Sequence, residues 1–350
     1  MQKGTDDMTL PRISIGALGG TIGMTAGPDG TVTPQLDGDD LVAGVPELAA
    51  LAQLRTHTVT TKPSPSITLA DLGSALEWAH AEVEGGAQGI VLTHGTDTLE
   101  ETAFILDLVW GRPQPIVLTG AMRSGSRFSS DGPANLASAV VAAASPDARD
   151  AGVLVCMNEE VHLARLVTKA DSQALESFQS PGAGPLGYVR EGVFRRQWHA
   201  QRTAIDAVEG SGSAPEDTWR DRPMVNIPII EAGLADDGAL FRALIDHGVG
   251  AVVINGSGVG HTSASAAEQV RNAVDHGAAI VVASRTHQSG TARKIYGYAG
   301  SESDLMSAGA ILAGRLSARK ARLALRVLQD VGLSIEEMRD VFERHWGGQA

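Results

Sequence analysis

The sequence predicts an α/β protein with a large N-terminal domain, built on a doubly wound, mostly parallel sheet, and a smaller C-terminal α/β domain of Rossmann-like type. Three observations lead to this prediction. Short apolar runs with β-branched centres repeatedly break at polar, glycine-containing turns and lead into helical spacing. A stretch of linker composition interrupts this alternation after residue 206. Beyond the linker, the same alternation of strands and helices resumes.

The first predicted elements are joined by turns rich in glycine and proline. Ile13–Leu18 is a predicted strand that ends at Gly19-Gly20, and these glycines let the backbone turn sharply and display Thr21. Met24–Gln35 has loop composition and is expected to act as a lid. The spacing then predicts, in order, a helix over Asp40–Leu54, an extended segment over Thr56–Thr61, a stiff turn at Lys62–Ser66 and a helix over Leu69–Val83.

The turn that follows Gly89–Leu92 is the centre of the predicted organisation. This apolar run is typical of a strand buried on both faces. Thr98 and Glu101 fit the capping box that opens a helix. Polar side chains therefore crowd the carboxyl end of the strand, where open α/β sheets bind their ligands. These side chains are Thr93, His94, Thr96 and Asp97.

Further strand-and-helix units complete both predicted domains. Strands are predicted at Pro115–Thr119 and Gly152–Met157, with a helix from Asp131 through Ala144 between them. In the smaller domain, strands are predicted near Met224–Ile230, Ala251–Asn255 and Ala278–Ala283, with helices between them and two more after the last strand. The predicted boundaries are residues 1–206 for the large domain, 207–222 for the linker and 223–350 for the smaller domain.

Composition narrows the class of protein. A net charge of −13 argues against nucleic acid or an anionic membrane as the main partner. The single cysteine, Cys156, excludes an internal disulfide and lies in an apolar run, so we expect a buried, inert thiol. Met1–Pro11 lacks the apolar core of a signal peptide, and no run reaches the about 18 apolar residues of a membrane span. We expect a cytoplasmic enzyme or binding protein.

The motifs for common cofactors are incomplete or absent. Gly256-Ser-Gly258-Val-Gly260-His261 follows a predicted strand, but His261 stands where the third glycine of a dinucleotide fingerprint belongs. The sequence contains no His-x-x-x-His pair, cysteine cluster or phosphate-binding Gly-x-x-x-x-Gly-Lys loop. We therefore expect neither a metal ion nor a cofactor.

Hydroxyl groups stand on the turns that follow the predicted strands. Thr21, Thr96 and Ser124 occupy such turns, with Asp97 and Lys169 expected at the same sheet edge. A threonine hydroxyl is a poor nucleophile until a neighbour accepts its proton, and a lysine beside a carboxylate can relay that proton. The N–H groups of glycine-rich turns can bind a developing oxyanion. Lys169 alone would be typical of a surface salt bridge, but together these groups are what amide hydrolysis through a threonyl acyl-enzyme needs.

Across nearly its whole length the sequence resembles the bacterial-type L-asparaginase family. Thr93–Glu101 matches the second signature of that family almost letter for letter, and Gly19–Ile22 resembles its first threonine motif. Other motifs of the family follow in the same order, namely Thr119–Arg123, Ser130–Leu136, Val167–Lys169, Gly184–Tyr188, Ser284-Arg285 and Lys320–Arg322.

The resemblance implies roles for particular residues. Thr21 would be the nucleophile, and Thr96, Asp97 and Lys169 would form a second catalytic set. Ser64 and Asp97 would hold the α-carboxylate and α-amino groups of the substrate. The substrate-binding set implied in full is Gly20, Ser64, Gly95, Thr96, Asp97, Ala121 and His261, with the backbones of Thr96 and Ala121 contributing oxyanion contacts. The resemblance also implies a homotetramer in which a neighbouring small domain completes each active site.

Three positions depart from the better-known members, and all bear on recognition and turnover. Gly30 stands at about the place of a mobile-loop tyrosine that assists the nucleophile. Pro65 replaces a Gln or Glu next to the binding serine, and His261 replaces an asparagine that reaches into the neighbouring site. Tyr296, with Tyr298 as its companion, either anchors a surface loop or supplies in trans the hydroxyl that the mobile loop lacks.

The expected activity is an asparaginase-type amidohydrolase that releases ammonia from L-asparagine. The first alternative is the same chemistry on another small or modified amide. An amidotransferase subunit shares the motifs, but residues 1–12 leave no room for its extra N-terminal domain, so we expect it less. The alternative from another class is a non-catalytic protein that binds an amino acid, and the two threonines together with Lys169 argue against it.

Overall fold

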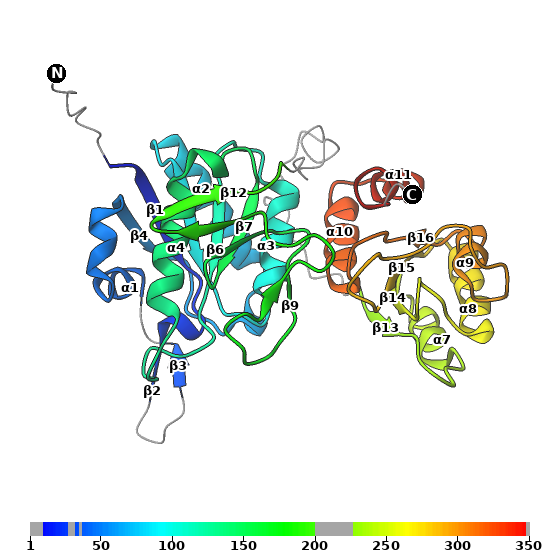
Figure 1. Cartoon of the computed structure of the whole chain (residues 1–350). Helices are drawn as coiled ribbons and strands as arrows, with labels where there is room; N and C mark the ends of the chain where they lie inside the picture. Colours follow the sequence, from blue (N-terminus) through cyan, green and yellow to red (C-terminus); the bar gives the residue numbers. More distant parts are fainter. Residues whose placement is uncertain (1–9, 27–31, 35–36, 200–226, 348–350) are drawn as a thin grey trace. The chain divides into compact units, whose positions relative to one another are not determined.

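The computed structural model describes residues 10–26, 32–34, 37–199 and 227–347 (Figure 1). The chain divides into two compact units, Met1–Ala204 and Ile205–Ala350. The predicted linker, residues 207–222, lies outside the described residues, as does Gly30 of the predicted lid. Each unit is an α/β structure with its own sheet, mostly parallel in the first unit and parallel in the second, which confirms the predicted fold class.

The first unit is built on an eight-stranded sheet of order β12-β11-β8-β7-β6-β5-β1-β4. Five neighbouring strands are parallel, and these are β4 (Gln53–Thr58), β1 (Arg12–Ala17), β5 (Gly89–Thr93), β6 (Ile116–Thr119) and β7 (Val153–Met157). Three antiparallel strands continue the sheet from β7, and these are β8 (Glu160–Leu163), β11 (Gly187–Arg190) and β12 (Val193–Arg196). The prediction missed these antiparallel strands.

Helices cover both faces of this sheet, as a doubly wound fold requires. Ile13 and Ile15 of β1 belong to a core that also includes residues of α1 and α4. Ser14, on the opposite face of β1, donates a 2.6 Å hydrogen bond to Glu82 of α2, which packs against α3. The helices are α1 (Gly38–Ala43), α2 (Leu69–Glu84), α3 (Leu99–Val109) and α4 (Gly132–Ala144). Short 3-10 segments are η1 (Thr21–Gly23), η2 (Pro46–Ala50), η3 (Ser64–Ser66) and η4 (Pro146–Ala148).

One predicted helix is much shorter in the structure. The predicted span Asp40–Leu54 is divided between α1, η2 and the start of β4. Gly44 ends α1, and Pro46 follows it with a ring that supplies no N–H and favours the first turn of a new segment. Two short antiparallel pairs also lie in this unit, β2 (Met24–Ala26) with β3 (Val32–Pro34) and β9 (Thr168–Lys169) with β10 (Phe178–Gln179).

The second unit contains a four-stranded parallel sheet of order β13-β14-β15-β16. Serine side chains cap four of its helices by accepting a backbone N–H, and these caps are Ser263, Ser301, Ser317 and Ser334. The strands are β13 (Ile229–Glu231), β14 (Ala251–Gly256), β15 (Ala279–Ser284) and β16 (Ile311–Leu312). The helices are α7 (Ala239–Asp246), α8 (Ala264–Asp275), α9 (Glu302–Ser307), α10 (Ala318–Asp330) and α11 (Ile335–Trp346).

The structure bears on two expectations from the sequence, one about the Cys156 thiol and one about membrane-spanning helices. Cys156 is buried in β7, as expected, and burial, with a smaller effect of Glu159, raises the pKa of its thiol to about 12, so the thiol stays protonated at neutral pH. Within the described ranges, every helix is too short or too polar to cross a lipid bilayer.

At Gly89 the backbone of β5 packs directly against α4. A Cβ atom on Gly89 would lie 2.2 Å from the carbonyl oxygen of Ala143 in α4. We expect Gly89→Ala to lower the free energy of unfolding by about 1–3 kcal/mol, because backbone must move to admit the methyl group. Urea unfolding followed by circular dichroism measures this.

The matched control is Gly125→Ala, since a Cβ atom at Gly125 would meet nothing within 4 Å. Its unfolding free energy should stay within about 0.5 kcal/mol of the unsubstituted protein. Equal unfolding free energies for the two variants would contradict the close packing of β5 on α4.

Candidate active site

Three parallel strands end at the same level in the first unit. Ala17 of β1 pairs with Thr93 of β5, and Thr93 pairs with Thr119 of β6. Backbone hydrogen bonds extend the ladder by one residue, from Leu18 N–H to Thr93 and from His94 N–H to Thr119. The turns after these strands therefore start side by side, at the edge where parallel sheets bind ligands.

Glycine lets two of these turns touch through their backbones. Gly20 has a φ angle of +91°, and a Cβ atom on it would lie 2.2 Å from the amide nitrogen of Gly95. A Cβ atom on Gly95 would lie 2.8 Å from the side chain of Ser64. Thr21 directly follows Gly20, and Thr96 directly follows Gly95. Both predicted catalytic threonines therefore lie next to the contact between the two turns.

Thr98 links the same region to η3 instead of capping α3. Its hydroxyl donates a 2.9 Å hydrogen bond to the carbonyl oxygen of Ser64. Thr98 occupies the N-cap position of α3, but its side chain makes no capping hydrogen bond, so the predicted capping box with Glu101 is wrong. Because the Thr98 hydroxyl binds the Ser64 carbonyl instead of capping α3, it holds the backbone of η3 at Ser64 and Pro65.

Lys169 joins Thr96 to Asp97. Its ammonium group donates to the Thr96 hydroxyl oxygen over 2.9 Å and to the Asp97 carboxylate over 2.7 Å. The lysine side chain is only 15% exposed, whereas that of Asp97 is 67% exposed. Because the Thr96 oxygen accepts from the lysine, the proton of the Thr96 hydroxyl is directed elsewhere.

The lysine is held in place by a carboxylate that the sequence reasoning did not single out. The backbone N–H of Lys169, in β9, donates a 2.8 Å hydrogen bond to Glu100, which is buried in the first turn of α3. Glu100 lies inside the motif Thr93–Glu101, so its place in that motif could have identified it from the sequence.

The start of α4 orders the turn after β6. Both oxygens of the Asp131 carboxylate accept backbone N–H groups, one from Met122 and one from Arg123. The side-chain amide of Asn135 donates to the Gly120 carbonyl over 3.0 Å. The buried backbone at Ala121 is therefore fixed by residues of the motif Ser130–Leu136.

His94 is buried and neutral, and it hydrogen-bonds the turn after β5 to α3. Its Nδ1 lies 2.7 Å from the Gly95 carbonyl oxygen and its Nε2 lies 2.9 Å from the Thr102 hydroxyl. Nδ1 must donate, because a carbonyl oxygen only accepts, so Nε2 accepts from Thr102. Burial lowers the pKa of His94 to about 4, and the hydrogen bond to Gly95 opposes this shift only in part.

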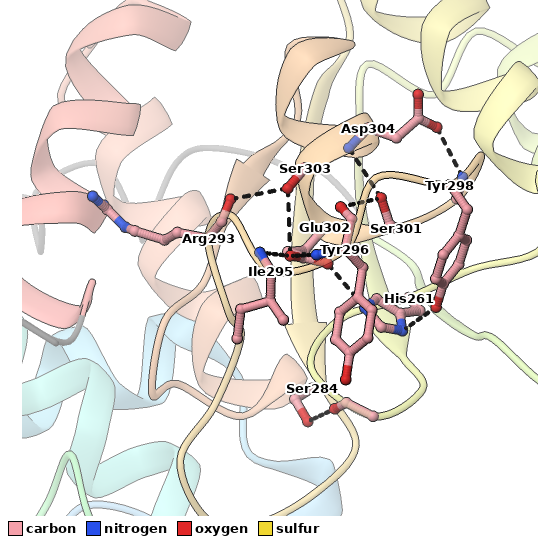
Figure 2. Close-up of polar contacts among 12 residues, drawn as sticks. His261, Ser284, Arg293, Ile295, Tyr296, Tyr298, Ser301, Glu302, Ser303 and Asp304 are labelled. Atoms are coloured by element: carbon pink, nitrogen blue, oxygen red, sulfur yellow. Dashed lines mark hydrogen bonds and ion pairs between the residues drawn. The ribbon is translucent and has the colours of Figure 1, made fainter.

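The structure thus collects most of the predicted site residues in the first unit. Contacts or hydrogen bonds join Gly20 to Gly95, Gly95 to Ser64, and Thr96 to Lys169 and Asp97. Thr21 and Ala121 belong to the same unit. The other two predicted residues, His261 and Tyr296, belong to the second unit, where their rings meet edge to face at 5.0 Å (Figure 2). Among the residues that the structure describes, no group of three or more His, Cys, Asp or Glu side chains could hold a metal ion.

Comparison with known proteins assigns the chain to a family. The family model described as "Asparaginase, N-terminal" matches residues 12–202, and the "Glutaminase/Asparaginase C-terminal domain" matches residues 226–342. The chain belongs to the asparaginase family. It is an asparaginase-type enzyme, an amidohydrolase, and the resemblance seen in its motifs is confirmed.

Relatives of this asparaginase-family chain match it over nearly its full length. A probable L-asparaginase of Deinococcus radiodurans is 35% identical over 338 residues, which cover 95% of this chain and 98% of the relative. L-asparaginase 2 of Escherichia coli strain K12 is 32% identical over 343 residues, covering 97% and 94%. The crystal structure of a probable cytoplasmic L-asparaginase from Campylobacter jejuni superimposes with a TM-score of 0.81 at 29% identity, covering 95% of this chain and 99% of that one.

The low pKa of His94 makes stability depend on pH. The unfolded chain binds a proton at the ordinary histidine pKa of 6.5, but the folded chain does not until the pH approaches about 4. Stability from this group is therefore full above pH 6.5 and falls as the pH drops toward 4. We expect His94 to account for a loss of about 2 kcal/mol in unfolding free energy between pH 7 and pH 5.

Urea unfolding of the protein and of His94→Gln at both pH values measures this contribution. The variant lacks the titrating group, so its loss of stability over this interval should be smaller by that amount. An identical pH dependence in both proteins would show that His94 protonates normally in the folded state.

Proposed function

We propose that this asparaginase-family enzyme hydrolyses the side-chain amide of L-asparagine to L-aspartate and ammonia through a threonyl acyl-enzyme. The observation that carries the proposal is the Lys169 ammonium group, which is hydrogen-bonded to both Thr96 and Asp97 beside the Gly20–Gly95 contact. A protein that only binds an amino acid has no need of a nearly buried lysine on a threonine hydroxyl. The relatives named as L-asparaginases support the same substrate.

In the first step the Thr21 hydroxyl oxygen attacks the carbon of the side-chain amide. An oxygen–carbon bond forms, the carbon–nitrogen bond breaks, and ammonia leaves with the proton that Thr21 gives up. The backbone N–H groups at Thr96 and Ala121 are proposed to stabilise the oxyanion, and the buried Asp131–Asn135 scaffold keeps the second of them fixed.

In the second step water hydrolyses the threonyl ester and regenerates Thr21. Thr96 is proposed to take part in this proton transfer, because Lys169 already occupies an acceptor position on its oxygen and leaves its proton to be donated. The α-amino group of the substrate is proposed to meet the exposed carboxylate of Asp97, and its α-carboxylate the Ser64 hydroxyl.

The mechanism predicts large losses of turnover from single substitutions. Thr21→Ala and Thr96→Ala should each lower kcat by at least ~10³-fold, since each removes a hydroxyl that reacts or transfers a proton. Lys169→Met should lower kcat by ~10²–10⁴-fold, the usual size of acid–base assistance. The measurement is the rate of ammonia release by the folded, purified variants. Near-normal release by either threonine variant would contradict the mechanism.

The matched control for Lys169→Met is Lys62→Met. Lys62 also pairs with an aspartate, Asp71, at 2.8 Å, but its side chain is 44% exposed and its ammonium group is hydrogen-bonded to Asp71 rather than to Thr21 or Thr96. Its loss should leave kcat within about threefold of the unsubstituted enzyme. Pro65 carries no polar side-chain group, so the sequence leaves other small amides open as substrates. The same assay on a panel of small amides distinguishes asparagine from these alternatives.

We further propose that the active unit is a cytoplasmic homotetramer in which the second unit of a neighbouring copy completes each site. The motivation is that two predicted site residues, His261 and Tyr296, lie in the second unit. Light scattering on the active enzyme should give four chains, and an active monomer would contradict the proposal. Cell fractionation tests the compartment.

A further inference from the structure

The second unit contains a hydrogen-bonded chain of a phenol, an imidazole and a carboxylate (Figure 2). The Tyr298 hydroxyl lies 2.8 Å from Nδ1 of His261, and Nε2 of the same ring lies 3.0 Å from Oε2 of Glu302. We propose that Tyr298, His261 and Glu302 form a proton-transfer relay that makes the Tyr298 phenol the base for the threonine nucleophile. The role of Tyr298 as a base rests on the proposed function, while the relay itself rests on the geometry of the second unit.

The buried end of the relay is a fixed carboxylate. Glu302 is fully buried at the start of α9, and its other oxygen, Oε1, accepts the backbone N–H groups of Ile295 and Tyr296 at 2.6 and 2.8 Å. Burial by itself raises the pKa of this carboxyl group, but these N–H groups and His261 outweigh burial, so the pKa is lowered. Glu302 is therefore ionised and can only accept hydrogen bonds.

An ionised Glu302 determines the direction of the whole chain. Nε2 of His261 must carry the proton that Glu302 accepts, so in the neutral ring Nδ1 is bare. The Tyr298 hydroxyl then donates to Nδ1. As the phenol oxygen takes the proton of the attacking threonine, its own proton moves to Nδ1, and the resulting imidazolium is stabilised by the Glu302 carboxylate, as in the serine-histidine-aspartate arrangement. The protons then return along the same path to the departing ammonia.

The exposed end of the relay is the phenol. Tyr298 is 52% exposed, whereas the His261 side chain is only 17% exposed. Tyr296 is 45% exposed and its ring touches that of His261, but its hydroxyl makes no hydrogen bond with the part of the chain that the structure describes. Of the two phenols considered from sequence, it is Tyr298 that the structure joins to a base.

Most of the charged side chains near the relay are paired with one another. Asp304 of α9 accepts the Gly300 N–H and pairs with Arg271 of α8, and Arg293 pairs with Glu343 of α11. Lys294 is exposed. The carboxylate that contacts the imidazole directly is that of Glu302.

The relay is tested without turnover by an arylsulfonyl fluoride, a probe that reacts with nucleophilic phenols. The Tyr298 oxygen bonds to sulfur, the sulfur–fluorine bond breaks, fluoride leaves, and the phenol proton passes to His261 and then to solvent. Peptide mapping by mass spectrometry should show Tyr298 labelled at least ~10-fold faster than Tyr296, the matched phenol of the same loop. In His261→Gln, which keeps an N–H donor for Glu302 but has no basic nitrogen, this advantage should disappear.

Labelling of Tyr298 no faster than that of Tyr296, including no labelling of either, would overturn the relay. Unchanged labelling in His261→Gln would do the same. The role of Glu302 has its own spectroscopic signature, because nitrogen-15 spectra of His261 should show the proton on Nε2 and its transfer to Nδ1 in Glu302→Gln. An unchanged tautomer in a folded Glu302→Gln variant would contradict the direction assigned to the chain.

Turnover tests the catalytic part of the inference. Tyr298→Phe should lower kcat by ~10²–10⁴-fold with little change in KM, and by at least ~10-fold more than Tyr296→Phe. Equal effects of the two substitutions would overturn the assignment of Tyr298 as the base. Thr21→Ala, assayed alongside, reports on the acyl-enzyme proposal separately, so failure of the relay and failure of the proposed function give different results.

Discussion

The backbone contact between Gly20 and Gly95 is the constraint on which the rest of the first unit's site depends. Two turns can approach to this distance only where both lack a Cβ atom, and Gly20 also adopts a φ angle that other residues avoid. Each turn places a threonine one residue after the contact. The positions of Thr21 and Thr96 are therefore set by main-chain geometry, which varies less than the conformation of a long side chain.

Lys169 illustrates how a short element is made rigid enough for chemistry. Its strand, β9, has only two residues, and such a strand contributes little stability of its own. The backbone N–H of Lys169 is bound by the buried Glu100, and the ammonium group is bound by Thr96 and Asp97. All three partners lie within five residues, 96–100, at the start of α3. The lysine is thus fixed at both ends to one helix start, which itself follows the central strand β5.

Periodicity and turn chemistry predicted the two sheets, the central strand β5 and the helix α4. They did not predict the antiparallel strands β8, β11 and β12, because strands of four residues carry too little pattern to separate from loops. The capping box at Thr98 fitted the sequence, yet the hydroxyl binds the Ser64 carbonyl 34 residues away, a long-range partner that local rules cannot include. Most residues of the proposed site were identified from the resemblance of the motifs to a known family. The fold then brings most of them together in the first unit.

Glu302 shows most clearly what the sequence alone could not supply. A carboxylate after an N-cap serine is typical of an exposed first helical turn, but this one is buried, which is costly unless every acceptor position is used. Holding the loop at Ile295 and Tyr296 occupies only one of its two oxygens. The second oxygen meets His261, and the far side of that ring meets a phenol that is half in solvent. Loop anchoring explains the first oxygen alone, whereas a proton relay ending at Tyr298 explains both oxygens, the orientation of the histidine and the exposure of the phenol.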